Sequence, residues 1–256
     1  MTAKAPSAPR VAAIVGPYLS GKTSLLEGLL HACGSLPRKG SIKDGNTVGD
    51  PSAEAKARQM SVEVSVASTS HLGDPWTFID CPGSVEFTQE AMHALMVADV
   101  AIVVCDPDPN RAITVAPILR FLDDHQIPHV LFLNKMDLPG AGSRIKDILT
   151  ALQGVSERPL VLRELPIRDG DLVTGFVDLV SERAYQYKPG QPSELVRMPE
   201  SLLPEEKELR QAMLENLADT DDHLMEELLE DVVPPKDEIY QAMTKDLQQD
   251  LIVEVF

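Results

Sequence analysis

Three short, continuous apolar runs mark the first 140 residues of the chain. They are Val11–Val15, Val100–Asp106 and Val130–Asn134, and each ends at a glycine or at a polar residue. Runs that do not alternate between apolar and polar positions are typical of parallel strands buried on both faces of a sheet. The pattern therefore predicts three central strands of a parallel sheet.

Helical patterns separate these runs. An apolar stripe along Leu25–Cys33 predicts one helix, and Val85–Val97 and Arg111–Gln126 predict two more. Two further segments, Val62–Ser70 and Trp76–Ile79, are expected to pair as an antiparallel hairpin. Strands that alternate with helices favour right-handed βαβ units, so the expected fold class is α/β, with a three-layer, mostly parallel sheet.

The pattern changes after about Gly154. Leu160–Arg168 and Leu172–Val180 are expected to form a pair of strands around a tight turn, and Leu251–Phe256 a final strand. Acidic helices are expected to begin near Pro204, Thr220 and Pro235. The expected organisation is a disordered tail over residues 1–9, one domain from residues 10–154 and 251–256, and an inserted α+β subdomain over residues 155–250.

Composition and charge narrow the function classes. Of the 256 residues, 43% are hydrophobic and 25% charged, which is ordinary for a folded chain. The net charge is −17, and residues 200–256 alone carry 17 of the 40 acidic and 4 of the 23 basic side chains. An acidic surface repels phosphate backbones, so general nucleic-acid binding is not expected.

Membrane insertion and disulfide bonding are not expected either. No apolar run approaches the roughly 20 residues that a membrane span requires. The three scattered cysteines, an odd number, indicate reduced thiols and a cytoplasmic protein.

Residues 16–23, GPYLSGKT, fit the phosphate-binding pattern G-x-x-x-x-G-K-[ST] between an expected strand and an expected helix. Gly16 and Gly21 let backbone N–H groups turn toward a phosphate, and the helix N-terminus adds partial positive charge. We expect Lys22 to reach the β- and γ-phosphates and the Thr23 hydroxyl to ligate Mg²⁺. The alternative is a chance glycine-rich turn, against which the flanking strand and helix argue.

The sequence DCPG follows the next expected strand. Asp80 is expected to hold Mg²⁺ through a water molecule, and the Gly83 N–H to bond the γ-phosphate. Taken alone, D-x-x-G is usually a simple turn. Its position after a phosphate-binding loop favours the functional interpretation.

The sequence NKMD follows the third apolar run, at the carboxyl edge where open α/β sheets bind ligands. The Asp137 carboxylate is suited to accept hydrogen bonds from N1–H and the 2-amino group of guanine, which adenine does not offer. Asn134 would brace the loop, and the Lys135 stem would cover the base. In isolation the tetrapeptide is as often a turn with a helix cap; as the third motif in this order it predicts GTP rather than ATP.

The three motifs in this order, together with residues 166–180 (PIRDGDLVTGFVDLV), resemble the GTPase domain of bacterial translation elongation factor G or a divergent elongation factor G-like protein. The resemblance covers essentially the whole chain. It implies a Ras-like P-loop NTPase fold with strand order 2-3-1-4-5-6, in which Leu251–Phe256 is the edge strand. It also implies GTP or GDP and Mg²⁺ as ligands, and it places Ser61 as a hydroxyl ligand of Mg²⁺ beside Thr23 and Asp80.

The sequence departs from this family at three places. Ser84 stands where the family has a histidine that helps to place the attacking water, so hydrolysis is expected to be slow, with Lys22 and Ser84 as the candidate catalytic residues. Leu19 replaces an aspartate that binds a monovalent cation in the family. The sequence ends at Phe256, before the family's last base-binding loop, so we expect a truncated domain that meets the ribosome only as part of a longer factor.

Two functions from different classes remain open on the sequence. The first is a Mg²⁺-dependent GTP-binding domain of a translation-factor-type GTPase. The second is a non-hydrolysing remnant that acts as an acidic protein-interaction module.

Overall fold

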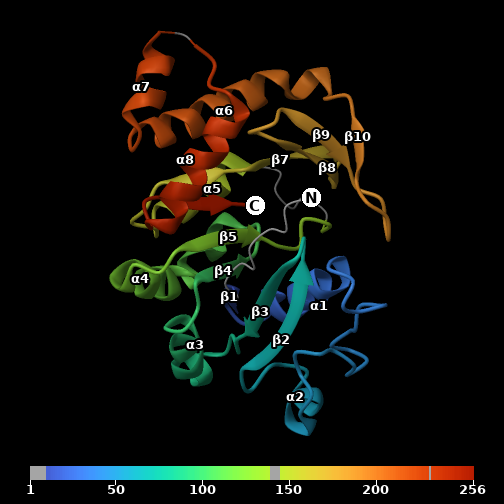
Figure 1. Cartoon of the computed structure of the whole chain (residues 1–256). Coiled ribbons are helices and arrows are strands. Elements are labelled where there is room, and N and C mark those ends of the chain that lie inside the picture. The colour runs from blue at the N-terminus through green and yellow to red at the C-terminus, as the bar shows by residue number, and fades with distance from the viewer. Residues whose placement is uncertain (1–9, 139–144, 231) are drawn as a thin grey trace. The chain divides into compact units, whose positions relative to one another are not determined.

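The computed structural model describes residues 10–138, 145–230 and 232–256 (Figure 1). The chain divides into two compact units, Met1–Cys105 and Asp106–Phe256. The expected tail, residues 1–9, lies outside the described residues, and the expected domain boundary near residue 154 falls inside the second unit and stays a prediction. No helix among the described residues is long and apolar enough to cross a membrane.

The first unit contains four paired strands and the helices that pack on them. Its elements are β1 Arg10–Val15, α1 Lys22–Ala32, α2 Ala53–Arg58, β2 Ser65–His71, β3 Asp74–Asp80, the 3₁₀ turn η1 Val85–Phe87, α3 Thr88–Leu95 and β4 Val100–Cys105. The strand order is β2-β3-β1-β4. β1 pairs in parallel with β3 and β4, and β2 pairs antiparallel with β3. The parallel strands and the hairpin expected from the sequence are thus confirmed.

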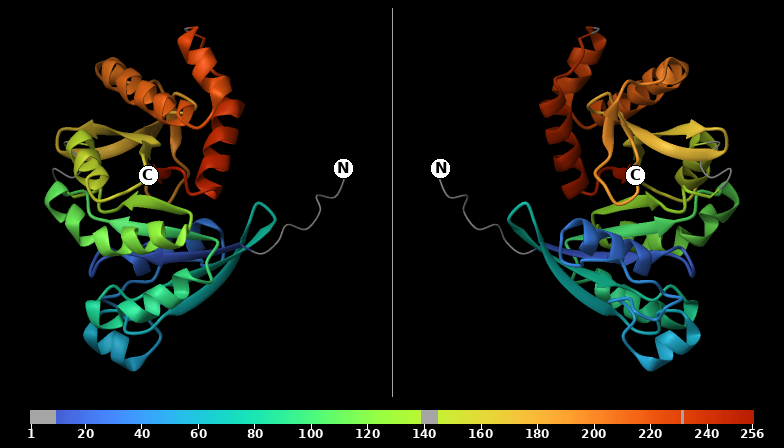
Figure 2. Two further views of the ribbon diagram at one scale, coloured as in Figure 1. Left: turned by 90° about the vertical axis from the view of Figure 1, so that its left-hand side faces the viewer. Right: turned by 90° about the vertical axis from the view of Figure 1, so that its right-hand side faces the viewer.

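Burial explains the continuous apolar runs. Ala12, Ala13 and Ile14 of β1 have no exposed surface, and in Figures 1 and 2 α1 and α3 lie on opposite faces of the strands that they contact. The turn of the hairpin is tighter than expected, because Leu72 and Gly73 form a two-residue turn with φ values of 51° and 87°. Such a turn matches the right-handed twist of the paired strands. The first strand begins at Ser65 rather than at Val62, and the second extends over Asp74–Asp80.

The second unit contains two groups of paired strands and most of the described helices. Its elements are η2 Pro109–Thr114, α4 Ala116–His125, β5 His129–Leu133, α5 Ile145–Gln153, β6 Leu160–Leu162, β7 Glu164–Asp169, β8 Leu172–Asp178, β9 Arg183–Gln186, β10 Glu194–Val196, η3 Glu200–Leu202, α6 Leu203–Ala218, α7 Asp222–Leu229, α8 Lys236–Gln248 and β11 Val253–Val255. β11 pairs in parallel with β5 and β6, while β10-β9-β8-β7 form a separate antiparallel sheet.

Two expectations about these strands were wrong. The segment expected as one strand, Leu160–Arg168, is two strands in different sheets. The chain changes sheets at Arg163, whose N–H donates to Val255 O (2.9 Å) and whose carbonyl accepts from Leu179 N (3.0 Å). Consequently the last strand is parallel to β5 as expected, but β6 pairs with its other side, so it is not an edge strand.

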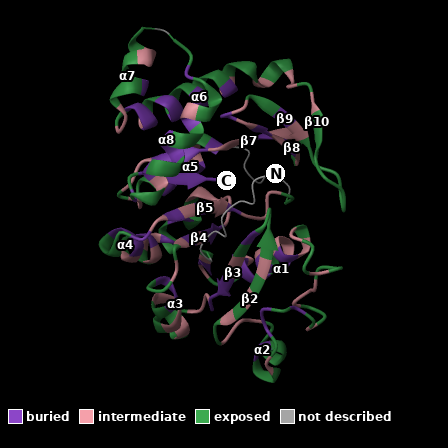
Figure 3. Cartoon of the chain, viewed as in Figure 1, coloured by how far each residue is buried: buried purple, intermediate pink, exposed green. Residues whose placement is uncertain are grey.

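The acidic helices begin within two residues of the positions expected from the sequence. The Asp221 carboxylate caps α7 by accepting hydrogen bonds from His223 N and Leu224 N. Figure 2 shows α6 and α8, coloured orange and red, beside one another, and both α7 and α8 contact α6. Buried residues, purple in Figure 3, concentrate on the strands and on the inner faces of the helices of each unit.

Candidate functional site

The loop between β1 and α1 has the tight backbone that a phosphate-binding loop requires. Gly16 has a φ of 148°, and a Cβ atom there would overlap the carbonyl oxygen of Val104. Gly21, with a φ of 98°, is the residue from which α1 begins. Leu19 also has a positive φ, 62°, and the residue is 60% exposed. Its aliphatic side chain offers no carboxylate or other ligand for a cation.

Lys22 lies inside this loop. Its side chain is only 6% exposed, and Nζ donates a hydrogen bond to Pro17 O at 3.0 Å. Burial lowers the pKa of Lys22, which the nearby Asp80 carboxylate partly opposes. A Cβ atom on Gly83 would overlap Lys22 Nζ and approach Pro17 O to 2.8 Å. The structure therefore places Lys22 Nζ beside Gly83, and only glycine fits this close approach. The phosphate-binding roles of both residues stay predictions.

Three oxygen-bearing side chains from separate segments meet beside Lys22. Thr23 Oγ1 donates to Asp80 Oδ2 at 2.7 Å and lies 3.2 Å from Ser61 Oγ. Thr23 is the second residue of α1, Asp80 ends β3, and Ser61 lies between α2 and β2. Asp80 has no exposed surface, and burial raises its pKa to about 7.

The donor set of these side chains fits Mg²⁺. Two hydroxyl oxygens and a carboxylate are hard ligands of the kind that Mg²⁺ prefers. Asp80 Oδ1 is fully buried and has no hydrogen-bond partner among the described residues, so a lone pair there is available to a cation or to a water bound to it. The ligand roles of Thr23, Ser61 and Asp80 stay predictions.

Sequence reasoning missed Asp50 and Glu27. Asp50 is 6% exposed, burial raises its pKa, and a hydrogen bond with Ser61 opposes that rise. Glu27 is 2% exposed and accepts from Gly40 N (2.6 Å) and Val48 N (2.5 Å), which fixes the segment that leads to Asp50. Glu27 is a charged residue among the apolar positions of the first helix, and this pattern could have indicated that its carboxylate has a structural role. No pattern in the sequence around Asp50 indicated that Asp50 lies near the site.

The buried carboxyl group of Asp80 predicts a pH dependence in the absence of metal. Because its pKa is raised from 3.8 to about 7, the folded chain holds a proton that the unfolded chain releases between these values. Without Mg²⁺, the melting temperature is therefore expected to fall as the pH rises from about 4 to 7. Thermal unfolding in a chelator at several pH values measures this.

The Asp80→Asn variant is the control for this pH dependence, since an amide does not titrate. Its melting temperature should change less than that of the wild type over the same range, and adding Mg²⁺ should flatten the wild-type profile. Equal pH profiles for the two proteins would contradict the assignment to Asp80.

The guanine motif lies in the second unit, at the carboxyl end of β5. Lys135 has a φ of 62°, and its Nζ pairs with Asp106 Oδ1 at 2.7 Å; Asp106 also pairs with Arg111. The Asp137 side chain is exposed. The Lys135 stem is thus held along a buried carboxylate, and Asp137 presents its oxygens to solvent.

A cavity of about 430 Å³ adjoins this motif within the second unit. Its wall includes residues that follow β5, residues of β7 and β8, and the last residue of the sequence. Among these residues are Asn134, Lys135, Asp137, Pro166, Phe176 and Phe256. The wall is largely apolar, with the polar atoms of the motif at one side, as in many small-molecule sites.

Ser84, the expected catalytic position, lies half-buried just before η1. Its hydroxyl donates to the Glu86 carboxylate, and this hydrogen bond lowers the pKa of Glu86. The Ser84 hydroxyl is therefore already hydrogen-bonded to a residue two positions along the chain.

The sequence matches the family of the elongation factor Tu GTP binding domain over residues 8–242. The chain belongs to this family. The match covers most of the chain, including the phosphate loop, the Asp80 and Asp137 motifs and most of the segment between them and β11. The mixed α/β fold with mostly parallel strands is therefore that of a P-loop GTPase domain.

Curated relatives of this GTP-binding domain are translation-related proteins by name. An elongation factor G-like protein of Synechocystis sp. is 52% identical over 246 residues, which cover 96% of this chain and 36% of that protein. A mitochondrial ribosome-releasing factor 2 of Danio rerio is 32% identical over 224 residues, 82% of this chain and 29% of that protein. The chain spans about a third of the length of these relatives.

A solved structure shows the same fold. A crystal structure of a protein from Thermus thermophilus matches with a TM-score of 0.86 and 27% sequence identity. The match covers 96% of this chain and 36% of that protein.

Proposed function

We propose that this GTP-binding domain binds GTP and GDP with Mg²⁺ and acts as a cytoplasmic, translation-factor-type switch whose hydrolysis is slow. The observation that carries the proposal is the convergence of Lys22, Thr23, Ser61 and Asp80 in one cluster, in which only Ser61 is partly exposed. Lys22 and the loop N–H groups bind the β- and γ-phosphates, and the three oxygen-bearing side chains hold the cation. Guanine specificity resides in Asp137.

When bound, Mg²⁺ neutralises charge on the β- and γ-phosphates. The chain's own residues position the nucleotide. Thr23 Oγ1 and Ser61 Oγ lie 3.2 Å apart, so both hydroxyls would hold the cation. Ser61 lies in the segment between α2 and β2, and we propose that this segment responds to the nucleotide state. Any role at the ribosome belongs to a longer factor that contains this domain.

Nucleotide competition tests the proposal. A fluorescent GTP analogue bound to the chain in Mg²⁺ should be displaced by GTP and by GDP and not by ATP at the same concentrations. An acidic interaction module without nucleotide binding is the alternative, and failure of the chain to bind the analogue would favour it. Displacement by ATP as effectively as by GTP would refute the role of Asp137.

Slow hydrolysis is proposed because Ser84 is too short to place a water molecule and is engaged with Glu86. The Ser84→His variant is expected to cleave bound GTP about ten- to a hundredfold faster in single-turnover measurements, since positioning of the nucleophile supplies much of the catalysis in phosphoryl transfer. The Ser84→Ala variant is the control, because it removes the Glu86 contact without adding an imidazole. A wild type already as fast as the histidine variant would show that another group places the water.

A further inference from the structure

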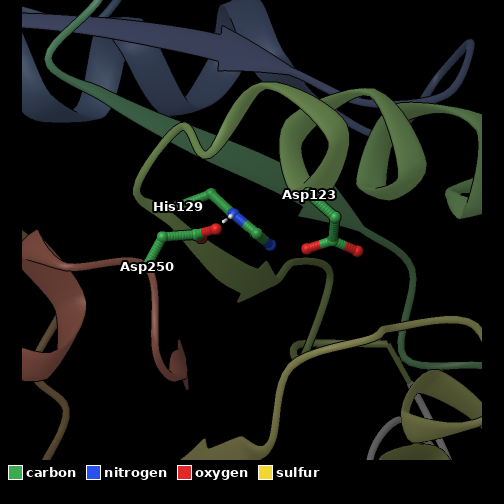
Figure 4. A group of neighbouring side chains, drawn as sticks. All are labelled: Asp123, His129 and Asp250. Atoms are coloured by element: carbon green, nitrogen blue, oxygen red, sulfur yellow. Dashed lines mark ion pairs between the residues drawn. The ribbon is translucent and has the colours of Figure 1, made fainter.

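Three buried side chains form a cluster in the second unit, at the end of β5 opposite to the guanine motif (Figure 4). Asp123 lies near the end of α4, His129 begins β5, and Asp250 lies just before β11. Asp123, His129 and Asp250 are 5%, 0% and 3% exposed, respectively. One potential ligand atom from each lies within 4.8 Å of the other two. None of these residues takes part in the proposed nucleotide site.

Among the described residues, one ring nitrogen of His129 has a hydrogen-bond partner and the other has none. Nδ1 lies 3.0 Å from the carbonyl oxygen of Ile127, and because a carbonyl only accepts, Nδ1 carries the hydrogen of this bond. In the neutral ring Nε2 therefore keeps its lone pair. Nε2 is buried without a hydrogen-bond partner among the described residues, and Figure 4 shows it pointing toward Asp123.

Each carboxylate shows the same division. Asp123 Oδ2 accepts from Glu157 N at 3.4 Å, whereas Oδ1 is buried and accepts no hydrogen bond from the described residues. Asp250 Oδ2 accepts from Arg158 Nε and Nη2 at 3.2 and 3.0 Å. Asp250 Oδ1 accepts no hydrogen bond from the described residues, and it lies 3.6 Å from His129 Nδ1. Each of the three side chains is thus oriented by a hydrogen bond to one of its polar atoms, and a second polar atom has no hydrogen bond from the described residues and is available to bind a ligand.

Figure 4 shows the two carboxylates at either end of the His129 ring, Asp250 near Nδ1 and Asp123 near Nε2, and one potential ligand atom of each residue lies within 4.8 Å of the other two. Two carboxylates buried this close together repel unless a positive charge lies between them. Metal ligands characteristically have this arrangement, in which the second nitrogen of the histidine donates to a backbone carbonyl and the carboxylates are hydrogen-bonded from outside. We propose that Asp123, His129 and Asp250 bind a divalent cation, with Zn²⁺ as the best match. One imidazole nitrogen and two carboxylate oxygens suit Zn²⁺, whereas Mg²⁺ and Ca²⁺ prefer oxygen ligands alone.

The spacing is compatible with such an ion. Ligand atoms at about 2.0–2.2 Å from one Zn²⁺ are roughly 4 Å apart at most, so small rotations of the side chains close the site. The ion would join α4, β5 and the segment before β11. Its binding is therefore expected to raise the melting temperature of the chain.

Zn²⁺ titration by calorimetry, in excess Mg²⁺ and GDP so that the proposed nucleotide site is occupied, tests the proposal. The untagged chain first receives the substitution His223→Gln, because His223, Glu227 and Glu238 form a second, more exposed group that is able to bind a metal ion. This protein is expected to bind one Zn²⁺ and to melt at a higher temperature with Zn²⁺ than with chelator. Adding His129→Gln or Asp123→Asn should weaken binding at least tenfold and abolish the rise.

Circular dichroism of each variant shows whether it is folded, and Asp123→Asn is nearly isosteric, so at least this variant is expected to retain the fold. The His223→Gln protein decides the matter by itself if neither variant folds. No Zn²⁺ bound by this protein, either in the titration or after purification from zinc-supplemented cells, would overturn the proposal. Undiminished Zn²⁺ binding in folded His129→Gln and Asp123→Asn variants would overturn it equally.

Discussion

Replacing Lys22 with alanine is expected to weaken GTP binding about a hundredfold or more while the chain stays folded. In the structure Lys22 is 6% exposed, and its ammonium group donates to Pro17 O. Hydrogen bonds to charged groups contribute about 1.5–3 kcal/mol each, and losing two of them, to the β- and γ-phosphates, costs about 3 kcal/mol or more. Every 1.4 kcal/mol or so is a factor of ten in affinity, so the loss exceeds about a hundredfold.

Calorimetric titration with GTP measures this loss. Lys245→Ala, which removes a half-exposed lysine from α8, is the matched control and should bind GTP like the wild type. Thermal unfolding of both variants shows that they are folded. Wild-type affinity in a folded Lys22→Ala variant would mean that the loop between β1 and α1 does not bind phosphate.

Replacing Asp137 with asparagine is expected to exchange guanine for xanthine selectivity. A carboxylate accepts two hydrogen bonds from guanine, and an asparagine amide presents a donor where the second acceptor was. Xanthine carries an oxygen in place of the 2-amino group and so suits the amide. We expect GTP affinity to fall about a hundredfold or more and affinity for xanthosine triphosphate to rise by a similar factor.

Competition of both nucleotides against a bound fluorescent GTP analogue measures the exchange. Asp171→Asn, in the exposed turn between β7 and β8, is the control. It removes the same charge from another exposed aspartate and should leave the nucleotide preference unchanged. An Asp137→Asn variant that still prefers GTP would show that the base is recognised elsewhere.

Much of the fold followed from local patterns in the sequence. β1, β4 and β5 appear where the chain is continuously apolar, because strands buried on both faces need no polar positions. The hairpin of β7 and β8 and the acidic helices were likewise expected from turn residues and prolines. What the patterns did not reveal is where the chain changes sheets: Arg163 lies within an unbroken strand-like run, and its two backbone partners are distant in the sequence.

In the candidate site, too, residues in short sequence motifs were predictable, and residues brought in by long-range contacts were not. Residues 16–23 and 80–83 have characteristic spacings, so Lys22, Thr23 and Asp80 were predictable from the residues alone. Ser61 was predictable only through the family resemblance, and Asp50 not at all, because each joins the site by a long-range contact. The cluster of Asp123, His129 and Asp250 is equally invisible in the sequence, since its members are brought together by the packing of α4, β5 and the segment before β11.

The Mg²⁺ dependence of GTP binding to the unmodified chain tests the central claim most directly. Calorimetric titration with GTP should give one site per chain in excess Mg²⁺ and an affinity at least tenfold lower in chelator, because Thr23, Ser61 and Asp80 then face the phosphates without the cation. No GTP binding in Mg²⁺, or the same affinity with and without the metal, would contradict the account.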